Sequence, residues 1–121
     1  MAFTPEMIEH FERPRHAGDL PEANVRVRVE NPVCGDVLEL AARVVTGRVE
    51  EVRFKAKGCV AAMAAGSAIA DRIAGAQLAA LRSVRPEDVS AALGGLPAES
   101  RHAGQLAADA LRRLIDAAEG R

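Results

Sequence analysis

The sequence predicts an α+β fold, with a three-stranded antiparallel sheet, an N-terminal helix and several C-terminal helices packed on one face of the sheet. Three observations support this prediction. A short helical pattern opens the chain, three strand-like runs with short connections follow, and helical periodicity then continues to the C-terminus. With 121 residues, the chain is expected to form a single domain, residues 1–121, whose core needs no disulfide.

The first helix is expected to begin at Thr4-Pro5-Glu6, where a hydroxyl can cap the helix and proline occupies its first turn. Met7, Ile8 and Phe11 then fall on one face of that helix. Residues 12–18 contain the proline and glycine that end it.

Three strand-like runs come next. Valine alternates with charged residues over 25–30, which predicts a half-buried strand. Residues 37–45 and 49–57 make two more runs, and Thr46-Gly47-Arg48 joins them as a short hairpin connection. The charged positions on these runs are most simply the solvated face of the sheet, and a docking surface for an acidic partner is the less favoured alternative; they include Arg26, Arg28, Arg53, Lys55 and Lys57.

Helical periodicity replaces strand alternation after Gly58 and continues to Ile73, with Gly75 as the expected stop. Residues 77–81 and 86–95 predict two short helical pieces. The last segment, residues 106–118, has the apolar spacing of an amphipathic helix.

Composition excludes several classes of function. Aromatic residues make up 2% of the chain, and 16 Lys+Arg against 17 Asp+Glu give a formal net charge of -1, so nucleic-acid binding is not expected. No signal peptide and no membrane-spanning run are recognisable, so we expect a cytoplasmic protein without a membrane partner. In a reducing compartment, the two cysteines are more suited to metal binding or reactivity than to a structural disulfide.

Four side chains form the candidate site. Cys34 and Asp36 flank Gly35 in a turn, and side chains at i and i+2 of an extended segment point the same way. Cys59 opens the helix after Gly58, where the helix dipole is expected to favour a thiolate. His102, at the start of the last helix, is the candidate for a fourth ligand.

This set of donors suits zinc or iron better than calcium or magnesium. Simpler interpretations stay open, because the two cysteines can merely pack in the core, Asp36 can be a turn residue, and His102 can be solvated or donate a structural hydrogen bond. His10 and His16 lack the spacing of a metal pair on one helix face, so we interpret both as structural or partner-facing.

Three ordered motifs resemble the IscU/NifU-type family of iron–sulfur cluster scaffolds. The first is Ile8-Glu9-His10-Phe11-Glu12-Arg13-Pro14-Arg15-His16-Ala17-Gly18, which is similar to the family's His-aromatic-x-x-Pro-Arg-x-x-Gly opening. The others are Cys34-Gly35-Asp36 and Arg53-Phe54-Lys55-Ala56-Lys57-Gly58-Cys59. The resemblance covers nearly the whole chain.

The resemblance implies an α+β scaffold, not an enzyme, that receives sulfur from a cysteine desulfurase, assembles a [2Fe-2S] cluster and passes it to iron–sulfur acceptor proteins. It implies that Cys34 and Cys59 are thiolate ligands and that Asp36 is an oxygen ligand that keeps the cluster labile. His102 matches the family's histidine before its third cysteine. Iron or zinc can take the place of the cluster, and the chain is expected to be a monomer or a homodimer.

The chain departs from the family pattern at two places. Ala103 stands where the third cysteine would fall, and Leu96-Pro97-Ala98-Glu99-Ser100 differs from the Leu-Pro-Pro-Val-Lys stretch with which some members engage a chaperone. Two alternatives therefore stay open. One is a degenerate scaffold that acts as a noncatalytic regulator or metal-binding partner of a desulfurase. The other is a sulfur-transfer protein that uses Cys59, with Cys34 as resolving thiol.

Overall fold

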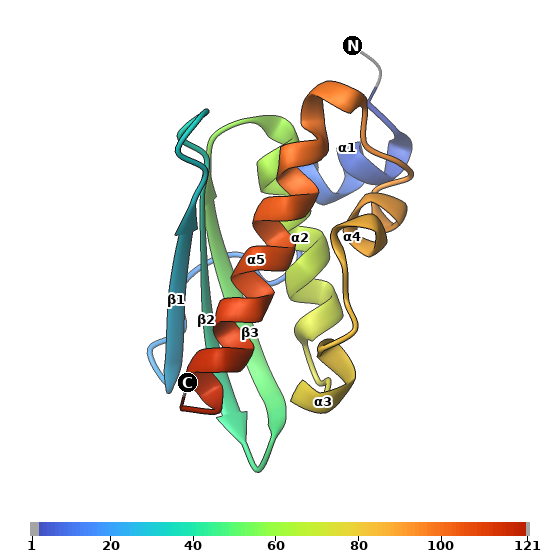
Figure 1. The fold of residues 1–121 in the computed structure, drawn as a ribbon. Coiled ribbons are helices and arrows are strands. Elements are labelled where there is room, and N and C mark those ends of the chain that lie inside the picture. Colours follow the sequence, from blue (N-terminus) through green and yellow to red (C-terminus); the bar gives the residue numbers. More distant parts are fainter. Residues whose placement is uncertain (1–2, 121) are drawn as a thin grey trace.

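The computed structural model describes residues 3–120 and confirms the α+β prediction, with a sheet of three antiparallel strands and helices before and after it (Figure 1). The described elements, in chain order, are α1 (Pro5–Glu12), β1 (Val25–Glu30), β2 (Val37–Val45), β3 (Arg48–Lys57), α2 (Val60–Ile73), α3 (Leu78–Leu81), α4 (Pro86–Ala92), the 3₁₀ turn η1 (Ala98–Ser100) and α5 (Arg101–Ala118). None of the helices described is long and apolar enough to cross a membrane.

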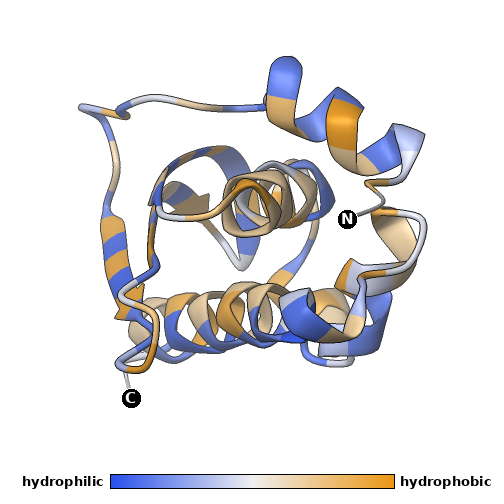
Figure 2. Cartoon of the chain, turned by 90° about the horizontal axis from the view of Figure 1, so that it is seen from above, coloured by the Kyte–Doolittle hydropathy of each residue, from blue (hydrophilic) through white to orange (hydrophobic). Residues whose placement is uncertain are grey.

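The sheet has the order β1-β2-β3, and all its pairs are antiparallel. Hydrophobic and hydrophilic residues alternate along β1, as Figure 2 shows, so one face of the sheet is apolar. Thr46 and Gly47 both have positive φ, 51° and 76°, which suits the two-residue turn between β2 and β3. At the opposite end, the last pair of the β2–β3 ladder is Val37↔Lys57, so the residues just beyond it come close together.

Helices α2 and α5 cover the apolar face of the sheet (Figure 1), which confirms the predicted one-sided arrangement. Seen from above in Figure 2, α2 lies in the middle of the molecule, between the sheet and the first helix. Its residues are small enough for close packing: a Cβ on Gly66 would lie 2.7 Å from the ring of Phe54. The Ala-rich sequence of α2 therefore lets it serve as the central core helix.

The segment between α1 and β1 is tied to the edge of β3. The Phe54 N–H donates to the His16 carbonyl at 2.9 Å, and the Gly18 N–H donates to the Phe54 carbonyl at 3.0 Å. The chain then reaches the outer face of the sheet, where the Arg26 guanidinium donates to the Leu20 carbonyl at 2.7 Å and pairs with Asp19 at 3.3 Å. Most of the basic side chains predicted on this face are exposed, as expected.

Candidate metal centre

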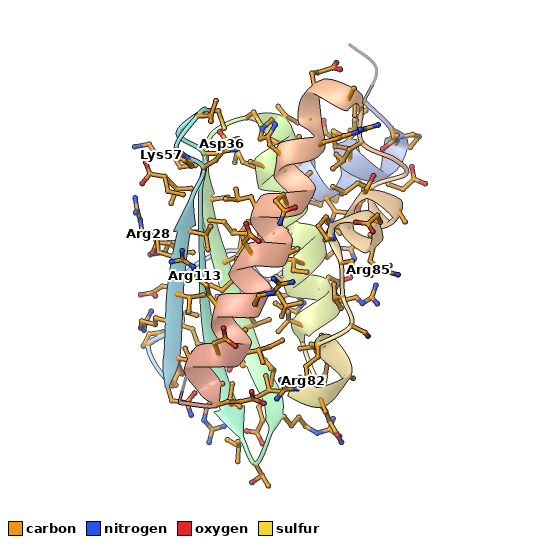
Figure 3. All side chains as sticks on the ribbon, in the orientation of Figure 1. Arg28, Asp36, Lys57, Arg82, Arg85 and Arg113 are labelled. Atoms are coloured by element: carbon orange, nitrogen blue, oxygen red, sulfur yellow. The ribbon has the colours of Figure 1, made fainter. Side chains whose placement is uncertain are left out.

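Three parts of the chain meet at the end of the sheet where β2 begins and β3 ends: the β1–β2 loop, the β3–α2 junction and the first turn of α5. Figure 3 shows Asp36 at this end, beside Lys57 of the neighbouring strand. The register of the sheet and the start of two helices, and not one local motif, therefore build the site.

The β1–β2 loop closes on itself and presents Cys34. The Asn31 side-chain carbonyl accepts from the Val33 N–H at 3.0 Å, and its backbone carbonyl accepts from the Gly35 N–H at 2.7 Å. The Asn31 N–H donates to the Asp36 carbonyl at 2.8 Å. Gly35 has φ +77°, a conformation that glycine adopts without strain. Cys34 is exposed at the tip of the loop, beside Val33, which is 94% exposed.

Asp36 lies at the centre of the site and is only 4% exposed, so it is more than a turn residue. Its Oδ1 accepts from the Cys59 backbone N–H at 3.2 Å, while Oδ2 lies 3.3 Å from Cys59 Sγ and 3.1 Å from His102 Nε2. Burial acts to raise the pKa of Asp36, but hydrogen bonds from both thiols and the Cys59 backbone, together with His102, hold this pKa below its usual value.

Cys59 is the N-cap of α2, which confirms that it opens the helix. Its Sγ accepts from the Ala62 N–H at 3.4 Å. The expectation that the helix start favours the thiolate is wrong, because the pKa of Cys59 is raised. Burial is the main cause; the Ala62 N–H opposes it, and the nearby Asp36 carboxylate adds to it. Burial, together with the Asp36 carboxylate, therefore outweighs the backbone N–H groups at the start of α2.

His102 lies in the first turn of α5 and is partly exposed. Its Nε2 lies 3.7 Å from Cys59 Sγ as well as 3.1 Å from Asp36. Ligand atoms of Cys34, Asp36 and His102 all lie within 4.8 Å of one another, and Cys59 contacts two of these three residues. The fold thus gathers the other three candidate residues around Asp36, and the role of all four as ligands stays a prediction.

The chain matches the model of the NifU-like N-terminal domain over residues 2–121. It belongs to this family. Among its relatives is the iron–sulfur cluster assembly scaffold protein IscU 1 of Archaeoglobus fulgidus, which is 36% identical over 113 residues; the match covers 93% of this chain and 74% of the relative. The scaffold protein IscU of Escherichia coli K12 is 33% identical, with 95% of this chain and 92% of the relative covered.

Solved structures agree on the fold. The crystal structure of FiSufU from Fervidobacterium islandicum AW-1 has a TM-score of 0.74 to this chain at 16% sequence identity. The match covers 93% of this chain and 96% of that one. The N-terminal part of a NifU-like protein from Brucella abortus has a TM-score of 0.64 at 22% identity, with 91% and 76% covered. At these identities, the likeness concerns the fold alone.

The other two histidines of this NifU-like domain lie outside the four-residue group. His10 Nδ1 lies 2.8 Å from the hydroxyl of Ser67, which is fully buried and also accepts from the Arg15 N–H at 2.7 Å. His16 Nε2 lies 3.4 Å from Asp71. Both histidines thus join the N-terminal segment to α2, which agrees with the structural interpretation.

Ala103 follows His102 in the first turn of α5 and is fully buried. Because successive helix residues point about 100° apart, its methyl group lies on a different face from the His102 ring. A thiol at this position would start within the core beneath the site and not on its exposed rim.

One contributor to the site was not predicted from the sequence. A Cβ on Gly58, which has φ +137°, would lie 2.0 Å from Asp36 Oδ1 and 2.7 Å from Asp36 Cγ. Gly58 therefore leaves the space that the carboxylate occupies. The only signal in the sequence is its place directly before Cys59, which also fits an ordinary strand end.

Proposed function

We propose that this chain is an iron–sulfur cluster assembly scaffold that holds a labile [2Fe-2S] cluster, or the iron from which it is built, on Cys34, Asp36, Cys59 and His102. The observation that carries the proposal is the set of side chains around Asp36, because one buried carboxylate contacts Cys59 and His102 and has a ligand atom within 4.8 Å of the Cys34 sulfur. The names of the relatives support it, since both IscU proteins are scaffolds for cluster assembly.

The spacing of the donor atoms suits a tetrahedral ion. Ligand atoms that bind one ion through bonds of about 2.0–2.3 Å lie about 3.3–3.8 Å apart at tetrahedral angles. Asp36 Oδ2, Cys59 Sγ and His102 Nε2 form a triangle with sides of 3.1, 3.3 and 3.7 Å. This triangle is close to one face of such a tetrahedron, and Cys34, whose sulfur lies within 4.8 Å of ligand atoms of Asp36 and His102, is the candidate for the fourth corner. Three donors are therefore spaced for iron or zinc, and the exposed Cys34 would close on the ion as it binds.

The donor set also explains why the cargo would be labile. Only two of the four donors are sulfur, and the imidazole and carboxylate bind soft iron less firmly than thiolates do. The raised pKa of Cys59 means that its proton must leave when a cation binds, so binding releases protons and weakens as pH falls. A cluster held in this way can be handed on.

We infer the partners from the same role. A cysteine desulfurase supplies sulfur, and iron–sulfur acceptor proteins receive the cluster in the cytoplasm. The chain acts as one domain, monomeric or homodimeric, and as a scaffold and not a catalyst. Zinc is the second cargo that the donor set supports.

Ala103 favours one alternative, a regulator or metal-binding partner of the desulfurase. A fully buried alanine next to His102 offers no third thiol to the site. Such a protein would keep the metal-binding group and the partner surface but would not build a cluster. Sulfur transfer by Cys59 has less support, because this thiol is engaged with the Ala62 N–H and Asp36 and its pKa is raised.

Anaerobic reconstitution with iron and sulfide tests the proposal. We expect visible absorption of a [2Fe-2S] centre and matching iron and sulfide contents. Cys59→Ser should abolish both signals, and Asp36→Ala should change how fast the cluster is lost to a chelator. Asp109→Ala, on the exposed side of α5, is the matched control for the carboxylate change. Absence of cluster absorption, together with absence of stoichiometric metal in the purified protein, would refute the proposal.

A further inference from the structure

The two cysteines converge on one carboxylate although 25 positions separate them in the sequence. Both are free thiols and both are exposed; Cys59 Sγ donates to Asp36 Oδ2 at 3.3 Å, and Cys34 has its sulfur within 4.8 Å of a ligand atom of Asp36. Cys59 is fixed, because its sulfur caps α2 and its backbone N–H is bound to Asp36. Cys34 instead lies on a loop whose tip is exposed.

Both sulfurs thus lie beside the same carboxylate. The β2–β3 ladder ends at the pair Val37↔Lys57, and both strands leave it at the same end of the sheet. A disulfide needs the two Cα atoms about 4.4–6.8 Å apart. Cys59 lies two positions beyond the end of the ladder on one side, and Cys34 lies three positions beyond it on the other. A link between the two sulfurs therefore requires the exposed loop that carries Cys34 to close onto Cys59.

We propose that this pair forms a reversible disulfide that closes the site, so that a peroxide switches the protein from a metal-binding form to a form that binds no metal. This inference rests on the proposed function and adds a means of regulation at the same four residues. The disulfide removes both sulfur donors at once. The remaining carboxylate and imidazole are too few to hold zinc or a cluster.

The chemistry balances with one peroxide. The Cys34 thiol loses its proton to water, and its sulfur attacks a peroxide oxygen; the O–O bond breaks, and a sulfenic acid and one water form. The Cys59 sulfur loses its proton and attacks the sulfenic sulfur. The S–O bond then breaks, and the hydroxide leaves as a second water. Two thiols are oxidised by two electrons, and hydrogen peroxide is reduced to two waters. A dithiol reductant reverses the step by thiol–disulfide exchange.

Cys34 is the sulfur that peroxide meets first. It lies beside Val33 at the loop tip and no hydrogen bond among the described residues holds its side chain to a helix, whereas the Cys59 sulfur contacts Asp36 and His102 and accepts from the Ala62 N–H. A variant with a single cysteine tests whether peroxide oxidises Cys34 first. Cys59→Ser keeps Cys34 but gives it no partner, so its sulfenic acid should persist and be trapped by a cyclic diketone.

The test uses the full reduced chain, free of metal, treated with one equivalent of hydrogen peroxide. We expect the intact mass to fall by two hydrogens and a non-reduced digest to contain a peptide pair joined through Cys34 and Cys59. We also expect zinc binding, measured by competition with a chromogenic chelator, to be lost and then restored by dithiothreitol. Cys34→Ser should show neither the mass change nor the linked peptides. Zinc loaded before treatment should protect both thiols.

Two results would overturn the inference: oxidation to sulfinic acid or to disulfides between chains without a Cys34–Cys59 link, or a linked protein that still binds zinc as tightly as the reduced one. Failure of the proposed function gives a different pattern. In that case the reduced, untreated chain binds neither zinc nor a reconstituted cluster, whatever the peptide map shows.

Discussion

Replacing Gly58 by alanine should damage the metal site more than it damages the fold. The added Cβ would lie 2.0 Å from Asp36 Oδ1, and contacts below 3.0 Å are essentially never seen for a Cβ. The carboxylate must therefore move by at least about 1 Å, which breaks its 3.2 Å hydrogen bond from the Cys59 N–H. Residues that orient metal ligands typically change metal affinity by about 10–100-fold, so we expect a loss of zinc affinity of that size.

The same substitution has a separate cost in stability. Gly58 has φ +137°, and a non-glycine residue in such a conformation costs about 1–3 kcal/mol. Gly95→Ala is the matched control, because Gly95 has φ +97° and a Cβ there would meet no atom within 4 Å. The control should therefore show backbone strain without displacement of Asp36.

Both variants are compared by urea unfolding of the metal-free protein and by zinc competition with a chromogenic chelator. We expect the two to lose similar amounts of unfolding free energy and only Gly58→Ala to lose zinc affinity. Equal zinc affinities in the two variants would show that Asp36 either tolerates displacement or does not bind the ion, and the reasoning from the Gly58 contact would then be refuted.

Three further outcomes are expected. The pKa of His10 is lowered, mainly by burial and then by Arg15. The folded state therefore binds a proton at His10 less readily than the unfolded state does. The stability that neutral His10 contributes should be present above about pH 6.5 and lost as the pH falls below that value. Urea unfolding at about pH 7.5 and 5.5 checks this sign, and a His10→Gln variant with an unchanged pH dependence would contradict it. Gly66→Ala should lower the unfolding free energy by about 1–3 kcal/mol, because the added Cβ would lie 2.7 Å from the Phe54 ring. This loss should outweigh the gain of about 1 kcal/mol that alanine brings in helix propensity. Increased stability of the variant would mean that the Phe54 ring moves aside. Ala103→Cys should leave the half-life of a reconstituted cluster unchanged, measured by the decay of its visible absorption, because the position is fully buried and the new thiol starts in the core; a longer half-life would mean that this thiol reaches the site.

Much of the fold could be predicted because local patterns reflect local geometry. Valine and charge alternate over β1 since successive side chains of a strand point to opposite faces, and Thr4-Pro5 marks the start of α1 through its cap. The tie between residues 16–18 and β3 could not be predicted in this way. It depends on backbone hydrogen bonds to Phe54, and backbone groups carry no signature in the sequence.

Some features of the candidate site could likewise be predicted from the sequence, and others could not. The identity of its donors followed from residue types and from the motifs around Cys34 and Cys59, and the start of a helix at Cys59 followed from the change of periodicity. The direction of the pKa shift of Cys59 could not be predicted from the sequence. Its helix position predicted a lowered pKa, but burial and the Asp36 carboxylate raise it, and both come from packing.

By itself, the sequence determined the order of helices and strands and the apolar face of the sheet, and it indicated four side chains as candidates to bind a soft cation. Tertiary structure alone decided that Asp36 is buried between Cys59 and His102, which are 23 and 66 positions away along the chain. It also decided that Gly58 makes room for that carboxylate. The physical reason is that periodicity and capping act over a few residues, whereas burial, charge and contact depend on neighbours that only the folded chain brings together.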